Sequence, residues 1–304
     1  SGLAIATGTS AQTSPVAAFG GNTFYVAWRD GVAGAAVGRP LSLGGGLGNP
    51  AVLRPGGASS VGTLAIDFDG SNFFVASGEN TSAPWGWHVH GQRVSPGGAL
   101  VGGVIDVASP EPLYGIGRIR TDALAGAHLV VWSGTSNLDD GDNVVRKALV
   151  SATGAVSQLD YVRPYDAAGD FYDVEPDVAA GGGQYLVVYS DGTNQRVAGR
   201  RFNSLGAPIA GASFTVASFV TTSGASTTAA AWDGWQYAVA YEQGAATSAD
   251  INLGAAWVTT AGTIHPLGAP SIVIGSARPE RGPVLVGDGT GRLLLSYWRY
   301  EPGV

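Results

Sequence analysis

The chain of 304 residues has a net charge of −7 and a pI near 5.0, and only 13% of its residues are charged. An acidic chain lacks the basic face that neutralises phosphates, so the composition argues against a nucleic-acid partner. Cysteine is absent, which excludes disulfides and thiolate metal sites, and no apolar run is long enough to span a membrane.

The composition also indicates a fold class and a location. Hydrophobic residues make up 45% of the chain, and 48 glycines suit many short strands joined by tight turns. Methionine and cysteine are both absent, which leaves no easily oxidised sulfur. The chain begins at Ser1 without an initiating methionine, as a processed or excised piece does. We therefore expect a secreted or cell-surface protein.

A two-strand unit recurs six times along the chain. Its clearest copy, at residues 175–191, reads EPDVAAGGGQYLVVYSD, two apolar strands joined by a glycine-rich reversal. The last residues of the second strands are spaced by 49 to 57 positions and are Trp28, Ser77, Trp132, Tyr189, Tyr241 and Tyr297. A period in this range is typical of β-propeller blades.

Each copy predicts a four-stranded antiparallel meander. Gly-Gly and Asp-Gly pairs after the first strand favour tight hairpin turns. The first two strands are continuously apolar, as buried strands are, whereas the third strands alternate. No amphipathic helical stripe persists. We predict an all-β fold, a six-bladed β-propeller forming a single domain over residues 1–304. The expected blades are approximately 14–54, 62–108, 117–163, 174–218, 226–275, and 282–304 with 1–9.

The two ends of the chain predict how the ring closes. LAIATGTS at the N-terminus resembles a fourth strand that precedes a blade. We expect it to complete the last blade. The third strand of that blade is missing, either because the chain was cut there or because the blade has only three strands.

The repeat resembles a known group. The phrase P-x-V-A-x-x-G-x-x-Y-L-V-V-W/Y-x-D, followed by V-x-G-R-R-x-x-x-x-G, is similar to the repeats of large secreted bacterial β-propeller proteins. The resemblance covers essentially the whole chain. It implies a propeller and an exported protein, and it implies no single activity.

Ligands of propellers are usually met by the loops that follow the second and fourth strands, which emerge on one face. Here those loops combine aromatic rings, which stack on sugars, with charged groups, which bind hydroxyls. The alternative is that the rings pack between blades and the charges maintain solubility. The candidate ligand-binding residues are Trp85, Trp87, Tyr114, Arg118, Arg163, Tyr165, Asp170 and Tyr172.

Two sequences suggest metal ligands. Asp139, Asp140 and Asp142 surround a glycine, like part of a calcium loop, although the sequence favours a solvated acidic turn. His88 and His90 share one face of a predicted strand and could begin a zinc or copper site, but no third ligand is evident. The expected cofactor is therefore none, or Ca²⁺.

Signatures of nucleophilic and nucleotide chemistry are absent: there is no G-x-S-x-G elbow, no thiol and no phosphate loop. We therefore expect a non-catalytic, lectin-like propeller that binds a carbohydrate or a protein. One alternative is a glycoside hydrolase or polysaccharide lyase with paired carboxylates. A second alternative is a structural module of a larger surface protein. The carboxylates of the enzyme alternative are Asp139, Asp142, Asp173 and Glu175.

Overall fold

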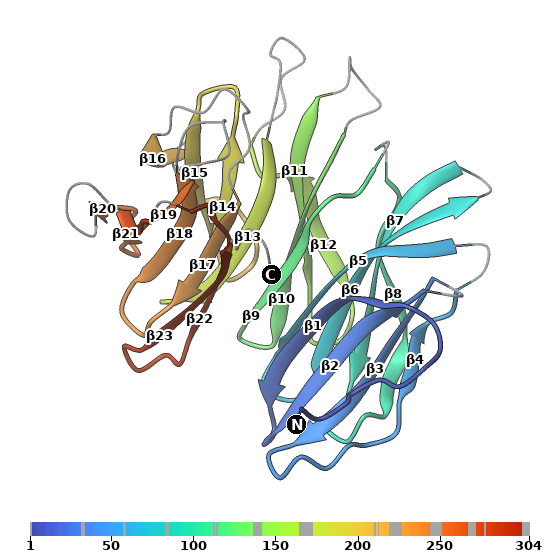
Figure 1. The fold of residues 1–304 in the computed structure, drawn as a ribbon. Coiled ribbons are helices and arrows are strands. Elements are labelled where there is room, and N and C mark those ends of the chain that lie inside the picture. Colours follow the sequence, from blue (N-terminus) through green and yellow to red (C-terminus); the bar gives the residue numbers. More distant parts are fainter. Residues whose placement is uncertain are drawn as a thin grey trace. The chain divides into compact units, whose positions relative to one another are not determined.

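The fold consists of strands and turns, without a helix in the described part of the chain (Figure 1). The computed structural model describes residues 2–31, 34–56, 59–82, 85–111, 113, 115–135, 142–163, 173–209, 211, 213–218, 227–243, 251–266, 272–276 and 278–299. Since no helix is present in these ranges, none there has the length and apolarity to cross a membrane.

The strands form six antiparallel sheets, each a meander of consecutive strands. Sheet 1 contains β1 (Gln12–Gly20), β2 (Thr23–Asp30), β3 (Ala35–Ser42) and β4 (Ala51–Arg54). Sheet 2 contains β5 (Ser59–Phe68), β6 (Phe73–Ser82), β7 (Trp85–Val94) and β8 (Leu100–Glu111). Sheet 3 contains β9 (Ile119–Leu124), β10 (Ala127–Thr135), β11 (Asn143–Val150) and β12 (Val156–Tyr161).

The last three sheets repeat the pattern with less regularity. Sheet 4 contains β13 (Asp173–Gly181), β14 (Gln184–Asp191), β15 (Arg196–Asn203) and β16 (Phe214–Ser218). Sheet 5 contains β17 (Thr228–Trp232), β18 (Tyr237–Gln243), β19 (Asn252–Val258), β20 (Ile264–Pro266) and β21 (Ile272–Ile274). Sheet 6 contains β22 (Glu280–Gly287) and β23 (Leu293–Arg299). The predicted all-β class is confirmed, and sheets 1 to 4 are the predicted four-stranded meanders.

Contacts divide the chain into two compact units. Unit 1 consists of Ser1–Val130, Gly134–Gly141 and Ala148–Leu159, and unit 2 consists of Val131–Ser133, Asp142–Lys147 and Asp160–Val304. Sheets 1 and 2 belong to unit 1, sheets 4, 5 and 6 belong to unit 2, and the division passes through sheet 3.

Within each unit, the first strands of consecutive sheets lie side by side, and we call them the inner strands. β1 contacts β5 and β5 contacts β9 in unit 1, while β13 contacts β17 and β17 contacts β22 in unit 2. The second strands of sheets 1 to 5 lie between two neighbours of their own sheet. Every residue of β14 is buried, as its continuous apolar sequence predicts for a strand covered on both faces.

Aromatic side chains connect two of the inner strands, β5 and β17, to the sheet before each of them. In unit 1 the Phe68 ring lies directly over Gly20, and in unit 2 the Trp232 ring lies directly over Gly181. The hydroxyl of Tyr237 also donates to the carbonyls of Gly181, at 2.7 Å, and Gln184, at 3.0 Å. The glycine before the turn is therefore required by packing as well as by turn geometry.

Replacing Gly181 with alanine is expected to destabilise the protein by about 2 kcal/mol, because overpacking a filled site displaces its neighbours. A Cβ atom at this position would lie 2.1 Å from the Trp232 ring. Urea denaturation measures the change. Gly103→Ala is the matched control, since a Cβ atom at Gly103 would meet nothing within 4 Å. Equal stability of the two variants would contradict the packing argument.

The N-terminal segment contacts the first sheet. Residues 2–11 contain no strand, and sheet 6 has two strands in the described part of the chain. Arg39 of β3 donates from Nη1 to the carbonyl of Ile5 at 2.9 Å. The prediction that residues 1–9 complete the last sheet stays a prediction. An arginine in the first sheet holds this segment locally.

Candidate functional site

A β-bulge interrupts the inner strand β13 near its start. The register between β13 and β14 shifts between Val174 and Asp177, so that Glu175 and Pro176 form the bulge. Proline is tolerated there because a bulge residue need not donate to the ladder. Glu175 has a φ of 53°, the left-handed conformation that side chains with a Cβ atom rarely adopt.

The same bulge recurs in two other inner strands. Ser14-Pro15 interrupts β1 with a φ of 51° at the serine, and Gly282-Pro283 interrupts β22 with a φ of 59° at the glycine. Glycine adopts this conformation without strain, whereas a glutamate there is disfavoured by about 1–2 kcal/mol. Strained residues that persist are concentrated at functional sites. Among the three bulges, only the one in β13 places a carboxylate at this position.

Residues of sheet 5 form hydrogen bonds with the bulges of both neighbouring sheets, sheets 4 and 6. Thr228, at the start of β17, donates from Oγ1 to the carbonyl of Glu175 at 2.6 Å. The carboxylate of Glu242, in β18, accepts the N–H of Gly282 at 2.8 Å. Thr228 is fully buried, while Glu175 is half-buried. The backbone of Glu175 is therefore fixed by its neighbour.

Two buried carboxylates at the ends of second strands form ion pairs between consecutive sheets. Glu79, at the end of β6, accepts hydrogen bonds from Nε of Arg54 at 2.6 Å and from Ser77 at 2.8 Å, and lies 3.3 Å from Nδ1 of His90. Burial alone would raise the pKa of Glu79, but hydrogen bonds from His90, Arg54 and Ser77 outweigh it and lower the pKa to about 2.

Asp191, at the end of β14, occupies the same repeat position as Glu79. It accepts a hydrogen bond from Nε of Arg196 at 2.8 Å and lies 3.5 Å from Nη1 of Arg163. The backbone N–H of Asn194 also donates to it at 3.0 Å. Burial alone would raise the pKa of Asp191, but the hydrogen bonds from Asn194 and Arg196 lower it. Sequence reasoning missed both pairs.

Stability is expected to fall in acid through Glu79. Because its folded pKa of about 2 lies below the ordinary value of 4.5, its contribution is complete above pH 4.5 and is lost as the pH falls towards 2. The whole difference corresponds to about 3 kcal/mol. Urea midpoints at pH 5 and pH 3 measure it, with Glu79→Gln as the comparison. An equal loss in both proteins would contradict the assignment.

The side chains of His128, Phe74 and Asp69 stabilise the turn between β5 and β6. The His128 ring stacks on Phe74 at 4.7 Å, and its Nε2 lies 3.8 Å from Oδ2 of Asp69. The other oxygen of Asp69 accepts the N–H groups of Ser71 and Asn72, at 2.8 and 2.7 Å. Burial raises the pKa of Asp67, near the end of β5. The hydrogen bonds of Asp69 show that this set shapes a turn.

The predicted ligand-binding residues lie in different environments. Arg163 forms an ion pair with Asp191. Arg118 is half-buried just before β9. Trp87, in β7, is half-buried, and its ring lies beside the backbone of Gly62, where a Cβ atom would be 3.7 Å from Cζ3 of the tryptophan. Gly62 lies at the register shift of the inner strand β5. Trp87 is thus the predicted aromatic residue that reaches an inner strand.

The structure describes only some of the remaining predicted residues. Asp142 is half-buried directly before β11, and Trp85 and Asp173 begin β7 and β13. The predicted residues that lie outside the described part of the chain are Tyr114, Asp139, Asp140, Tyr165, Asp170 and Tyr172. The calcium and aromatic-loop predictions therefore stay predictions.

The histidine pair does not form the suggested metal site. The rings of His88 and His90 stack with centroids 5.6 Å apart and an interplanar angle of 6°. His90 faces Glu79, and His88 shares a hydrogen bond with Ser109. Burial lowers the pKa of His88. No group of three or more His, Asp or Glu side chains in the described ranges is arranged to hold a metal ion.

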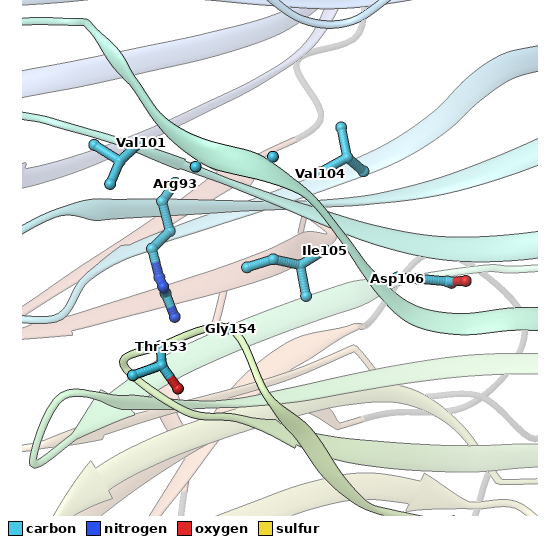
Figure 2. Close-up of a pocket in the computed structure, with 9 residues that line it drawn as sticks. Arg93, Val101, Val104, Ile105, Asp106, Thr153 and Gly154 are labelled. Carbon is cyan, nitrogen blue, oxygen red and sulfur yellow. The ribbon is translucent and has the colours of Figure 1, made fainter.

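A cavity of about 330 Å³ lies in unit 1, beside the register shift of β8 (Figure 2). Arg93 points from β7 towards Thr153 and Gly154, and its guanidinium donates to the carbonyl of Ser151. Arg201 of sheet 4 makes the same bond to Thr260 of sheet 5. Since this contact recurs between other sheets, Arg93 serves sheet packing, and we assign the cavity no ligand.

No protein-family model matches the chain, and no curated protein sequence matches it. Solved structures do. A Trypanosoma rangeli sialidase is 10% identical with a TM-score of 0.55, over 96% of this chain and 53% of that one. A subtype N10 neuraminidase-like protein of A/little yellow-shouldered bat/Guatemala is 10% identical with a TM-score of 0.53, over 95% of this chain and 91% of that one. The Bacillus subtilis arabinanase Arb43A is 13% identical with a TM-score of 0.46, over 78% and 92%.

The repeated antiparallel sheets and these similarities define a β-propeller fold. They do not identify the secreted bacterial repeat family that the sequence resembles. They also correct the functional interpretation. The prediction of a non-catalytic, lectin-like or protein-binding module is contradicted, because the solved structures with this fold include a sialidase. The expectation that the protein is not an enzyme is contradicted by the same match.

Proposed function

We propose that the protein is a glycoside hydrolase and that Glu175 is one of its catalytic carboxylates. The observation that carries the proposal is the strained conformation of Glu175 in the bulge of an inner strand, at a position where β22 has glycine. A strained acidic residue is retained more readily if its carboxylate is needed. The sialidase with the same fold supports the reaction class.

Hydrolysis of a glycosidic bond uses two carboxyl groups, one of which donates a proton to the leaving oxygen while the other acts as a base or nucleophile. Glu175 supplies one of them. The candidates for the second are Asp142, directly before β11, and Asp173, two residues before Glu175 in β13. Both belong to unit 2, as Glu175 does. The carbohydrate ligand expected from the sequence becomes the substrate in this proposal.

The test is hydrolysis of a panel of polysaccharides and aryl glycosides that includes arabinan, xylan and a sialyl glycoside. Glu175→Gln is expected to lower kcat/KM on the cleaved substrate by at least about 10³-fold, because the amide can neither transfer the proton nor act as a nucleophile. Asp106→Asn in β8 is the control carboxylate. Cleavage of no substrate, or full activity of Glu175→Gln, would reject the proposal.

The finer sequence predictions fit this function. We propose that the six repeats form six blades of one propeller spanning residues 1–304, and that the protein acts outside the cell on extended carbohydrate. Calcium binding at Asp139, Asp140 and Asp142 is part of the same proposal.

A further inference from the structure

The inner strand β17 holds β13 at two points around its bulge. Thr228 donates from Oγ1 to the carbonyl of Glu175 at 2.6 Å, and the N–H of Ala230 donates to Oδ2 of Asp177 at 3.0 Å. Asp177 directly follows the bulge, and both Thr228 and Asp177 are buried. Buried polar groups are costly unless they are hydrogen-bonded, so these two contacts are integral to the boundary between sheets 4 and 5.

The bulge of β1 forms without a hydroxyl at the equivalent position. Phe68 and Trp232 share one repeat position, because each ring lies over the glycine before the turn of the preceding sheet. The residue four places earlier is Thr228 in β17 and Leu64 in β5. Leu64 has no donor in its side chain, and Ser14 of β1 nevertheless has a φ of 51°. The left-handed backbone therefore does not require the hydroxyl.

The hydrogen bond from Thr228 acts on the Glu175 side chain through the backbone. Holding the carbonyl oxygen fixes the ψ angle of Glu175, and the bulge fixes its φ angle. Together the two angles fix the direction in which the Cα–Cβ bond leaves the strand. This direction matters in catalysis, since a misplacement of about 1 Å at a reacting group costs about 100-fold in rate.

We propose that Thr228 is a positioning residue of the glycoside hydrolase site, whose hydroxyl directs the Glu175 carboxylate towards the substrate. This role rests on the proposed function, because it requires Glu175 to take part in hydrolysis. Thr228 is fully buried, so it acts on the reaction through Glu175 and without touching the substrate. Serine would keep the donor, whereas valine would keep the shape of threonine without it.

The test compares Thr228→Val and Thr228→Ser in the full chain, on the substrate that the protein cleaves. Thr228→Val is expected to lower kcat at least about tenfold and leave KM unchanged, because it disturbs a group that acts in the transition state. Thr228→Ser is expected to keep the kcat of the unchanged protein. In a chain that carries Glu175→Gln, Thr228→Val is expected to cause no further loss.

Tyr237→Phe is the matched control for a purely structural effect. Tyr237 of β18 is another buried hydroxyl of sheet 5, and it donates to the carbonyls of Gly181 and Gln184 in sheet 4. Gly181 is the last residue of β13, at the opposite end from the bulge. Tyr237→Phe is expected to lower the thermal unfolding midpoint and leave kcat unchanged. All rates are measured below the unfolding midpoints of the variants.

The outcomes separate this role from the proposed function. Cleavage of no substrate, or full activity of Glu175→Gln, rejects the hydrolase assignment and the role of Thr228 with it. If Glu175→Gln is inactive but Thr228→Val keeps its kcat, the hydrolase assignment stands and the positioning role is wrong. The positioning role is also wrong if Tyr237→Phe lowers kcat as much as Thr228→Val, or if the Thr228→Val loss persists beside Glu175→Gln.

Discussion

Replacing Glu175 with glycine is expected to abolish hydrolysis while making the protein slightly more stable. The activity loss, at least about 10³-fold in kcat/KM, follows from removing a catalytic carboxylate. The gain in stability follows from the φ of 53°, which glycine adopts without steric strain. Relief of about 1–2 kcal/mol is partly offset by the greater entropy of glycine in the unfolded chain, so a net gain of about 0.5 kcal/mol is expected.

Ser14→Gly is the matched control for this prediction. Ser14 has a φ of 51° in the equivalent bulge of β1 and also precedes a proline. The substitution is expected to raise stability by a similar amount and leave hydrolysis unchanged. Thermal unfolding and initial rates on the cleaved substrate measure both effects. If Glu175→Gly loses stability, or retains activity, the strain at this residue has another cause.

Replacing Asp191 with alanine is expected to destabilise the protein by about 3 kcal/mol. Asp191 is fully buried and forms ion pairs with Arg196 at 2.8 Å and Arg163 at 3.5 Å. Its removal therefore leaves two partly buried guanidinium groups without their shared anion. Breaking a buried ion pair from one side costs more than the pair itself contributes. The backbone N–H of Asn194 also loses its acceptor.

Urea denaturation at pH 7 measures the Asp191 effect. The control is Asp288→Ala, which removes an exposed turn carboxylate and is expected to cost much less stability. In a cycle with Arg163→Ala, the two substitutions are expected to be non-additive. The ion pair does not join sheets 3 and 4 if the two changes in unfolding free energy are strictly additive. The same follows if Asp191→Ala loses no more stability than the control.

Much of the candidate site was visible in the sequence once the six repeats are aligned. Ser14-Pro15, Glu175-Pro176 and Gly282-Pro283 fall at one repeat position, and the bulge follows because proline cannot donate to the ladder. Glu175 was named among the candidate carboxylates for its charge alone. The left-handed backbone that distinguishes it appears only in the structure.

Other predictions needed contacts that sequence does not contain. Arg163 was expected to bind a ligand because it follows a fourth strand in a charged loop, but it pairs with Asp191 of the next sheet. The N-terminal segment was expected to complete sheet 6 because its residues suit a strand. A hydrogen bond from Arg39 to Ile5 holds it against β3. In both cases the observed partner is far away in the sequence, and the local sequence pattern would have allowed other partners.

By itself, the sequence determined the strands, their order within each sheet and the positions of the turns. Alternating and continuous apolar residues and glycine-rich reversals act over a few neighbouring positions, and six repetitions reinforce them. Only the tertiary structure decided which charges are buried as pairs and which bulge carries a carboxylate. These depend on contacts between residues far apart in the chain, where burial and packing choose among partners that the local sequence treats alike.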